Sequence, residues 1–199
     1  MKLKTEIFIT MNSLILFFGL KSINTPKVQE QPITGTAILY MSKHGTTNKV
    51  ALEIKELLKE DDITLINLDK QTTPDLSQCA RIIIGGSIHI GKIQKKIQLF
   101  CQQNQAVLKS KPLGLFLCCM YDGDKATEQF NTAFPEDLRA IAKCKSLMGY
   151  ELHFDRMNLF DRTITKKITG YSESMSKINH NELKQFVMEL KQPASNSFH

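Results

Sequence analysis

Hydroxyl residues and a glycine gather directly after the first apolar run of the folded region, in the segment Ser42-Lys-His-Gly-Thr-Thr47. Apolar residues at helical spacing follow from Val50 to Leu58, so this segment stands where a helix begins. The first N–H groups of a helix have no partner within the helix, and its dipole favours negative charge there. Gly45 permits close approach of the backbone. The segment therefore predicts an anion site, with a capped helix and a tight turn as the alternative.

The sequence lacks other patterns that would direct the chemistry elsewhere. It has no G-K-[ST] ending typical of a nucleoside triphosphate loop and no G-x-G-x-x-G typical of a dinucleotide site. Its five histidines are scattered, its cysteines have no metal-ligand spacing, and no Ser-His-Asp set or carboxylate pair is evident. We therefore predict no metal site.

A second glycine-rich segment ends the apolar run Arg81-Ile-Ile-Ile-Gly-Gly86 and continues as Ser87-Ile-His-Ile-Gly91. Glycines allow a flat aromatic ring to lie against the backbone, and loop N–H and C=O groups can meet the polar edge of such a ring. The alternative is a glycine-rich strand end without a ligand.

A third candidate loop, Cys118-Cys-Met-Tyr-Asp-Gly123, follows the apolar run that Pro112 opens. Tyr121 can stack on a ring bound nearby, and the chain contains no tryptophan that could do so instead. A tyrosine in the core or at its rim is the alternative.

The elements around these loops indicate an α/β protein. Apolar runs predict strands at residues 36–40, 63–68, 81–86, 113–120 and 146–154, and helical spacing alternates with them up to a closing helix at 179–191. The connection between the second and third strands leaves room only for a short or irregular helix. Strands that are apolar throughout favour a parallel sheet covered on both faces. The five-stranded doubly wound form has the order 2-1-3-4-5 and binds ligands at the carboxyl ends of its strands.

These loops resemble those of the flavodoxin-like FMN proteins. Ser42-x-His-Gly-x-Thr47 is similar to the phosphate loop [ST]-x-[ST]-G-x-T of that family, with His44 in place of a hydroxyl residue. The resemblance implies a flavodoxin-like three-layer sandwich, with helices on both faces of the sheet, and FMN as the cofactor. It implies that the FMN-binding residues are Ser42, Lys43, His44, Gly45, Thr46, Thr47, Gly86, Ser87, Ile88, His89, Gly91, Cys119, Met120, Tyr121, Asp122 and Gly123.

Two features resemble a subgroup, the menaquinone-dependent protoporphyrinogen oxidases. Its strand-three loop is similar to Gly86-Ser-Ile-His-Ile-Gly91, and its aromatic and basic insertion is similar to Phe160-Asp-Arg162 with Lys166 and Lys167. The resemblance implies dehydrogenation of a reduced, porphyrinogen-like substrate, with a quinone or a protein as the electron acceptor. A one-electron carrier flavodoxin and a non-enzymatic flavodoxin-like binding module remain as alternatives.

The distribution of charge indicates which kinds of partner the protein attracts. The formal net charge is +6, and five lysines without an acid lie between Gly91 and Lys111. The alternatives are a solvated helix face and attraction to an anionic substrate or lipid head group. We predict no nucleic-acid partner. Ordinary carrier flavodoxins are typically acidic, so the basic balance favours the enzyme.

The cysteines and the first residues bear on localisation. The five cysteines are predicted to be reduced, mostly buried thiols, which indicates a cytoplasmic protein. Residues 1–34 form an apolar extension and linker, in which the run from Ile7 to Leu20 follows two lysines. A cleaved signal, a membrane-associating segment and a dispensable extension remain open for it. Residues 35–191 form the predicted FMN-binding domain, and residues 192–199 a disordered tail.

Overall fold

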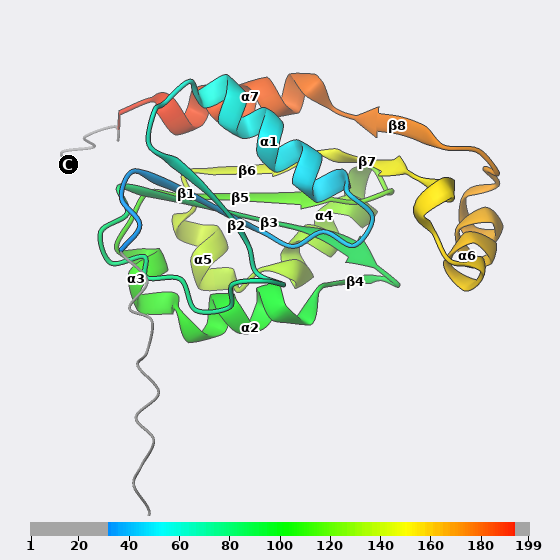
Figure 1. Cartoon of the computed structure of the whole chain (residues 1–199), viewed down its shortest axis with the longest axis horizontal. Helices are drawn as coiled ribbons and strands as arrows, with labels where there is room; N and C mark the ends of the chain where they lie inside the picture. The colour runs from blue at the N-terminus through cyan, green and yellow to red at the C-terminus, as the bar shows by residue number, and fades with distance from the viewer. Residues whose placement is uncertain (1–31, 194–199) are drawn as a thin grey trace, which may run out of the picture.

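The computed structural model describes residues 32–193, which form a parallel sheet between two layers of helices (Figure 1). The sheet contains β1 (Thr36–Tyr40), β2 (Ile63–Asn67), β3 (Arg81–His89), β5 (Leu113–Cys118) and β6 (Cys144–Leu147). Their order is β2-β1-β3-β5-β6, all parallel, and the short β4 (Lys92–Ile93) pairs antiparallel with the end of β3. This arrangement confirms the predicted order 2-1-3-4-5.

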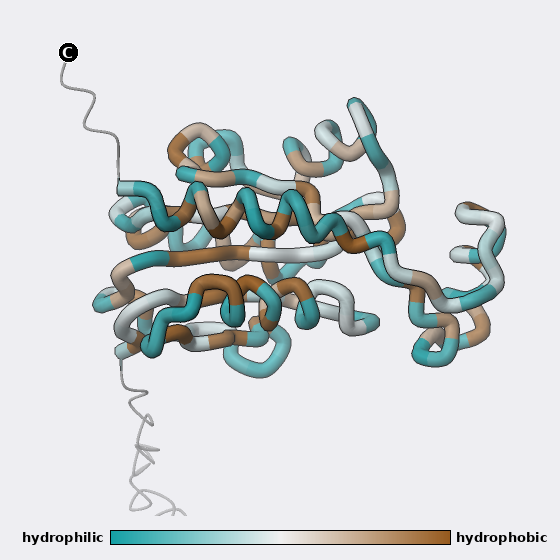
Figure 2. The backbone as a smooth tube through the Cα atoms, turned by 90° about the horizontal axis from the view of Figure 1, so that it is seen from above, coloured by the Kyte–Doolittle hydropathy of each residue, from teal (hydrophilic) through white to brown (hydrophobic). Residues whose placement is uncertain are grey.

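The two helical layers cover opposite faces of the sheet. Helices α1 (Thr46–Leu58) and α7 (His180–Lys191) lie on one face, and α2 (Lys95–Gln103), α3 (Gln105–Lys109), α4 (Gly123–Ala133) and α5 (Glu136–Ile141) lie on the other (Figure 1). Alternate residues of β1 supply both cores, because Ile38 packs with α1 and α7 whereas Leu39 packs with the α2 side. In Figure 2 the hydrophobic colour appears along the central strands and on turns of the helices that flank them. The apolar runs of the sequence are therefore strands buried on both faces.

The connection from β2 to β3 contains no helix in residues 68–80. Turns carry the chain instead, and the buried side chains of Leu68, Leu76 and Cys79 seal this part of the core. At the amino-terminal side, Ile33 donates its backbone N–H to the carbonyl of Asp75 and packs against the same cluster. Ile33, predicted as linker, thus contributes to the domain. Most of the extension and the end of the tail lie outside the described residues.

The prediction of one fifth strand over residues 146–154 was wrong. The sheet strand β6 ends at Leu147, and β7 (Gly149–Leu152) leaves the sheet to pair antiparallel with β8 (Met175–Ile178). Gly149 has a φ of 71°, and a Cβ there would lie 2.0 Å from the carbonyl oxygen of Lys177. The close approach of these two backbones turns the chain out of the sheet, which a run of apolar letters does not reveal.

Between β7 and β8 lies an insertion that stands beside the sheet. It contains the short 3-10 helix η1 (Phe154–Arg156) and α6 (Leu159–Thr169), and it projects at one end of the molecule in Figures 1 and 2. Asn158 caps α6 by accepting the N–H of Asp161 at 2.8 Å, and Gly170 ends it with a φ of 74°. No helix within residues 32–193 is long and apolar enough to cross a membrane.

Candidate functional site

The carboxyl ends of β1, β3 and β5 bring most of the predicted ligand residues around one cavity of about 150 Å³. The parallel register places these ends at the same edge of the sheet, since Tyr40 pairs with Gly85 and Gly86 with Leu117. The predicted residues that line the cavity are Ser42, Lys43, His44, Thr46, Thr47, Ser87, Ile88, His89, Cys119 and Met120. We refer to it as the flavin cavity.

The loop after β1 offers free donors at the start of α1. Gly45, at the N-cap position, has a φ of 108°, no side chain caps the helix, and its first turn contains no acidic residue. The hydroxyl oxygen of Thr47 is buried and has no hydrogen-bond partner among the described residues, and its polar neighbour is the weakly bonding thiol of Cys118. A phosphate at this position would satisfy both the backbone N–H groups and the orphaned hydroxyl. The residues present therefore fit the phosphate of FMN.

Two residues near this loop were missed by the sequence analysis. A Cβ on Gly45 would lie 2.8 Å from a guanidinium nitrogen of Arg156, so η1 places a cation against the loop. Glu151 of β7 accepts the Thr46 hydroxyl on its carbonyl at 3.3 Å and pairs its carboxylate with Lys49 at 2.6 Å. The repeated sequence Phe-Asp-Arg, at 154–156 and again at 160–162, was the available signal for Arg156.

Asp161 of α6 joins three segments at the flavin cavity. Its carboxylate lies 2.8 Å from the Lys43 ammonium, 3.6 Å from Nε2 of His44 and 4.0 Å from Nε2 of His89. Asn158 donates its side-chain N–H to the same carboxylate at 3.2 Å, and the Lys43 ammonium lies 2.8 Å from Nε2 of His89. The side chain of Asp161 is 8% exposed. This group of five residues, the Asp161 cluster, fastens the insertion to the loops after β1 and β3.

The pKa shifts in the cluster have clear causes. The hydrogen bond from Lys43 holds the pKa of the Asp161 carboxyl below its usual value. Burial and then the charge of Lys43 lower the pKa of His44 and of His89 from 6.5, against the opposing effect of Asp161. Both histidines are therefore neutral at pH 7, and the Lys43–Asp161 ion pair carries the charge.

The glycine near the end of β3 and the glycine in the β3–β4 turn have different causes. A Cβ on Gly86 would lie 2.5 Å from Cδ1 of Ile93, so a valine at this position would disturb β4 as well as any ligand. Gly91 has a φ of 76° beside Ile90 at 49°, and both residues form the tip of the β3–β4 hairpin. Gln94, which the sequence analysis overlooked, accepts the Ser87 backbone N–H at 3.0 Å and donates to its hydroxyl at 2.7 Å.

The loop after β5 divides between two cavities. Cys119 and Met120 line the flavin cavity, whereas Tyr121, Asp122 and Gly123 line a second and larger cavity. The ammonium of Lys125 lies 3.7 Å from the centre of the Tyr121 ring. The structure thus does not bring Tyr121 together with the other predicted ring-contacting residues.

All five cysteines are free and buried. Burial raises the pKa of Cys118 to about 12 and that of Cys119 to about 11. Thiols with such pKa values are protonated at neutral pH and are poor nucleophiles. Within residues 32–193, no group of histidine, cysteine and acidic side chains is arranged to hold a metal ion.

A comparison with known protein families finds one whose model matches this chain. Residues 37–179 match the flavodoxin domain family Flavodoxin_5. The chain belongs to this family. Membership and the geometry of the β1–α1 loop agree with the prediction of FMN as the cofactor of this flavodoxin domain. A comparison with curated proteins finds no match.

Solved flavodoxins align with this chain at low identity, and the one with a TM-score above 0.5 shares its fold. The two-electron reduced flavodoxin of Megasphaera elsdenii aligns at 17% identity over 78% of this chain and 97% of that chain, with a TM-score of 0.51. Flavodoxin 2 of Bacillus cereus aligns at 16% identity over the same shares, with a TM-score of 0.48. Fusobacterium nucleatum flavodoxin bound to flavin mononucleotide aligns at 20% identity over 43% of this chain, with a TM-score of 0.34. The chain spans about half the length of that flavodoxin, 52%.

The Thr47 hydroxyl provides a test of the phosphate site. Thr47→Val keeps the shape of the buried side chain but removes the hydroxyl, so we expect the Kd for FMN to rise by roughly ten- to a hundredfold, since a hydrogen bond to a charged group contributes roughly 1.5–3 kcal/mol. Titration of the flavodoxin domain with FMN, followed by flavin fluorescence, measures this change. Thr64→Val on β2, at the edge of the sheet, is the matched control. Unchanged FMN affinity in Thr47→Val, with an unchanged Tm, would contradict the assignment.

The Asp161 cluster predicts a loss of order in acid. His44 and His89 bind protons less readily in the folded state, so the unfolded state takes up more protons below pH 6.5 and the cluster loses stability as the pH falls through this range. The contribution of Asp161, whose pKa is depressed, disappears at still lower pH. Hydrogen exchange should therefore show α6 opening more often on acidification, after correction for the intrinsic rate, while α7 serves as the internal reference. An equal response of both helices would refute this assignment.

Proposed function

We propose that this flavodoxin domain is an FMN-dependent oxidoreductase that dehydrogenates a reduced, porphyrinogen-like organic substrate and passes the electrons to a quinone. The family supports a flavin-based redox function, and the sequence resemblance described above supports the finer assignment. The observation that carries the proposal is the position of the insertion. Asp161, the central residue of the segment Phe160–Arg162, lines the flavin cavity, and its carboxylate lies against Lys43 and His89 at the ends of β1 and β3.

The insertion favours a small substrate over a protein partner. Ile164, Thr165 and Ile168 of α6 line the flavin cavity together with the loops of the sheet, so the cavity is walled on the side of α6. A one-electron carrier needs a cofactor edge that a partner protein can approach. A wall of mostly apolar residues is better suited to an organic molecule that enters from the rim. The formal charge of +6 also departs from the acidic character of carrier flavodoxins.

Residues of this chain can manage the protons of such a reaction. Bound FMN supplies the capacity to accept two electrons from the substrate. His44 lines the flavin cavity and is neutral at pH 7, so its imidazole can accept a proton that the substrate releases. His89 also lines the cavity, but its Nε2 accepts a hydrogen bond from the Lys43 ammonium. Arg156 supplies positive charge beside the phosphate loop and favours an anionic cofactor, whereas the charge of Lys43 is balanced by Asp161. Reduction of one quinone consumes two electrons and two protons, which balances one pair of hydrogens removed from the substrate. The six hydrogens lost between protoporphyrinogen and protoporphyrin therefore require three such cycles and three quinones.

The free donors at the start of α1 argue against a non-enzymatic module. A binding module without cofactor gains nothing from a buried hydroxyl that has no partner, because such a group costs about 1–3 kcal/mol. Thr47 and the uncapped helix start are therefore best explained by a bound anion. The one-electron carrier remains the second candidate, and the acceptor separates it from the enzyme.

The reaction can be tested directly under anaerobic conditions. We expect the full chain loaded with FMN to convert protoporphyrinogen to protoporphyrin in the presence of a menaquinone analogue, measured by the rise of porphyrin fluorescence. Thr47→Val should lose activity in proportion to its lost flavin, and Thr64→Val should keep it. Oxidation no faster than in the absence of protein would overturn the proposed substrate. Rapid electron exchange with a redox protein alone would favour the carrier.

A peripheral membrane contact is the second part of the proposal. Leu159, Phe160 and Ile168 of α6 are 81%, 67% and 55% exposed, and Ile90 at the β3–β4 tip is 73% exposed. Lys92 adjoins Ile90, and Lys166 and Lys167 lie in the last turn of α6. Apolar side chains beside lysines are the two signals that stable attachment to an anionic bilayer requires. We define the exposed residues Ile90, Leu159, Phe160 and Ile168 as the apolar rim.

Vesicle sedimentation tests this contact. We expect the full chain to sediment with vesicles of anionic lipid at low salt, and the double variant Leu159→Ser, Phe160→Ser to bind several-fold more weakly. Met188→Ser is the control, because Met188 on α7 is 61% exposed but lies outside the apolar rim. Deletion of residues 1–30 separates the contribution of the amino-terminal apolar run. Full solubility beside anionic vesicles at low salt would refute the contact and favour a soluble acceptor.

A further inference from the structure

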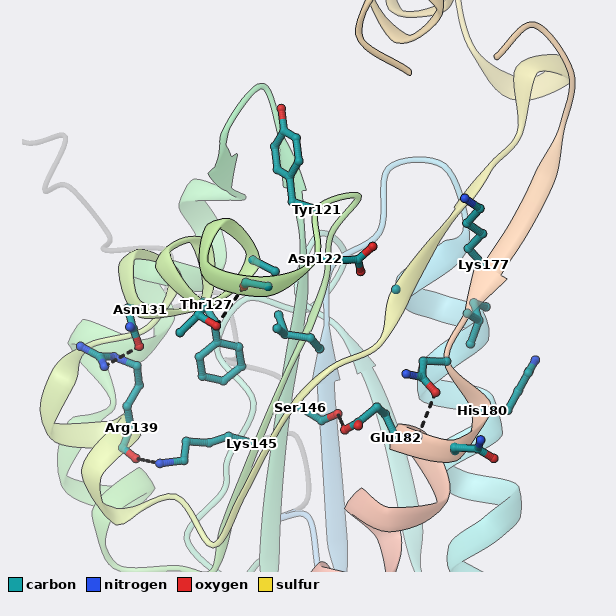
Figure 3. A pocket seen from close by; sticks show the side chains of 18 residues that line it. Tyr121, Asp122, Thr127, Asn131, Arg139, Lys145, Ser146, Lys177, His180 and Glu182 are labelled. Carbon is teal, nitrogen blue, oxygen red and sulfur yellow. Dashed lines mark hydrogen bonds between the residues drawn. The ribbon is translucent and has the colours of Figure 1, made fainter. Parts of the chain in front are cut away.

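A second cavity of about 910 Å³ (Figure 3) is lined by Tyr121, Asp122 and Gly123 of the same β5–α4 loop that contributes Cys119 and Met120 to the flavin cavity. Helix α4 forms one wall, and the end of β8 with the start of α7 forms the other. Strand β6, the edge strand of the sheet, lies between the two walls. The sequence analysis did not anticipate this groove, because its walls come from elements that are far apart in the chain. We refer to it as the edge cavity.

The edge cavity combines apolar surface with polar groups. Ala126 and Phe130 of α4, Leu147 of β6 and Ile178 of β8 are apolar residues in its lining, and most of each is buried. Thr127 and Asn131 of α4 stand nearby in Figure 3. Polar and charged residues make up most of the lining, and these apolar side chains form a patch among them. The volume lies within the range of roughly 300–1,000 Å³ that is typical of small-molecule sites.

Three cations of the lining have no ion-pair partner among the described residues. The Arg139 guanidinium donates to the side-chain oxygen of Asn131 at 2.8 Å, and the Lys145 ammonium donates to the backbone carbonyl of Arg139 at 3.1 Å. Lys177 donates to the hydroxyl of Tyr171 at 3.3 Å. In each case the acceptor is a neutral oxygen, which holds the cation in position but does not balance its positive charge. Lys43, in contrast, is paired with the carboxylate of Asp161.

The acidic groups of the cavity lie apart from Arg139 and Lys145. In Figure 3, Arg139 and Lys145 occupy one end, whereas Asp122 and Lys177 stand toward the other and Glu182 lies across from Ser146. Glu182 accepts the Ser146 hydroxyl at 3.2 Å. An anionic group is thus favoured at the Arg139–Lys145 end, and a hydrogen-bond donor is favoured near the two carboxylates.

The edge strand itself is poorly suited to pairing with another strand. β6 has only four residues and carries the exposed Lys145 in its interior, and both features hinder pairing at a sheet edge. The groove is therefore better suited to a compact molecule than to an extended peptide. We propose that the edge cavity binds a small organic acid with an aromatic or similarly apolar body, its carboxylate directed to Lys145 and Arg139.

Such a ligand would be sensed at the flavin cavity. The loop of residues 119–123 lines both cavities, with Cys119 and Met120 on one side and Tyr121 to Gly123 on the other. Fixing Tyr121 against a ligand would restrict the segment that carries Met120. The binding proposal itself does not depend on the redox reaction, so it can be tested without a turnover assay.

The test uses 2-naphthoate as the probe and 2-naphthol as its uncharged counterpart. We expect calorimetric titration of the FMN-loaded full chain to show naphthoate binding more tightly than naphthol. Lys145→Gln should weaken naphthoate binding about fivefold and leave naphthol unchanged, because only the charged contact is lost. Lys70→Gln, beyond the opposite edge strand β2, is the matched control and should change neither.

A second variant guards against an indirect effect of Lys145. Thr127 is exposed on α4 and lines the cavity, so Thr127→Trp should fill the groove and abolish binding of both probes while preserving the Tm and FMN content. Equal affinity for the two probes, unchanged naphthoate binding in either Lys145→Gln or Thr127→Trp, or no heat of binding at millimolar naphthoate would each overturn the proposal. Failure of the porphyrinogen assay would leave it intact.

Discussion

Burial of the parallel sheet on both faces is the constraint on which the site depends. Strand β1 is buried on both faces, so both faces of the sheet must be covered by other parts of the chain. The chain leaves β1 through helix α1 on one face of the sheet, and the residues after β2 contribute to the core on the other face. Such crossovers place the carboxyl ends of β1, β3 and β5 at one edge of the sheet, where their loops converge. The start of α1 points into this convergence with unpaired donors, and its preference for an anion follows from the architecture.

The insertion after β7 changes what this common architecture can do. Gly149 directs the chain out of the sheet, and the β7–β8 hairpin carries α6 to the flavin cavity. Asp161 then accepts a hydrogen bond from the Lys43 ammonium, forms an ion pair with it, and lies near His44 and His89. A carboxylate with so little exposure is stabilised only by such partners, so the insertion and the two loops depend on one another for their positions. His44, the departure from the usual phosphate-loop pattern, belongs to this contact.

The β5–α4 loop connects two different environments. On the flavin side it presents the buried thiol of Cys119 and the side chain of Met120, and on the other side Tyr121 and Asp122 border the edge cavity. A loop shared by two cavities can transmit occupancy of one to the other by a change in its own conformation, without movement of the sheet. The apolar rim lies on the insertion and the β3–β4 tip, and thus on elements that the flavin cavity shares.

Apolar runs and helical spacing were enough to predict the order of the parallel sheet, because these are local patterns with local causes. The motif Ser42–Thr47 was likewise enough to predict a helix start with free donors after the first strand. No local pattern predicted that the chain leaves the sheet at Gly149, since that turn depends on a backbone contact with Lys177, which is 28 residues later in the chain. Nor did any such pattern reveal that Gly86 serves packing against Ile93, that Tyr121 lines the edge cavity, or that Asp161 meets Lys43 across 118 positions. Only the tertiary structure decides such contacts, because it alone brings distant segments together.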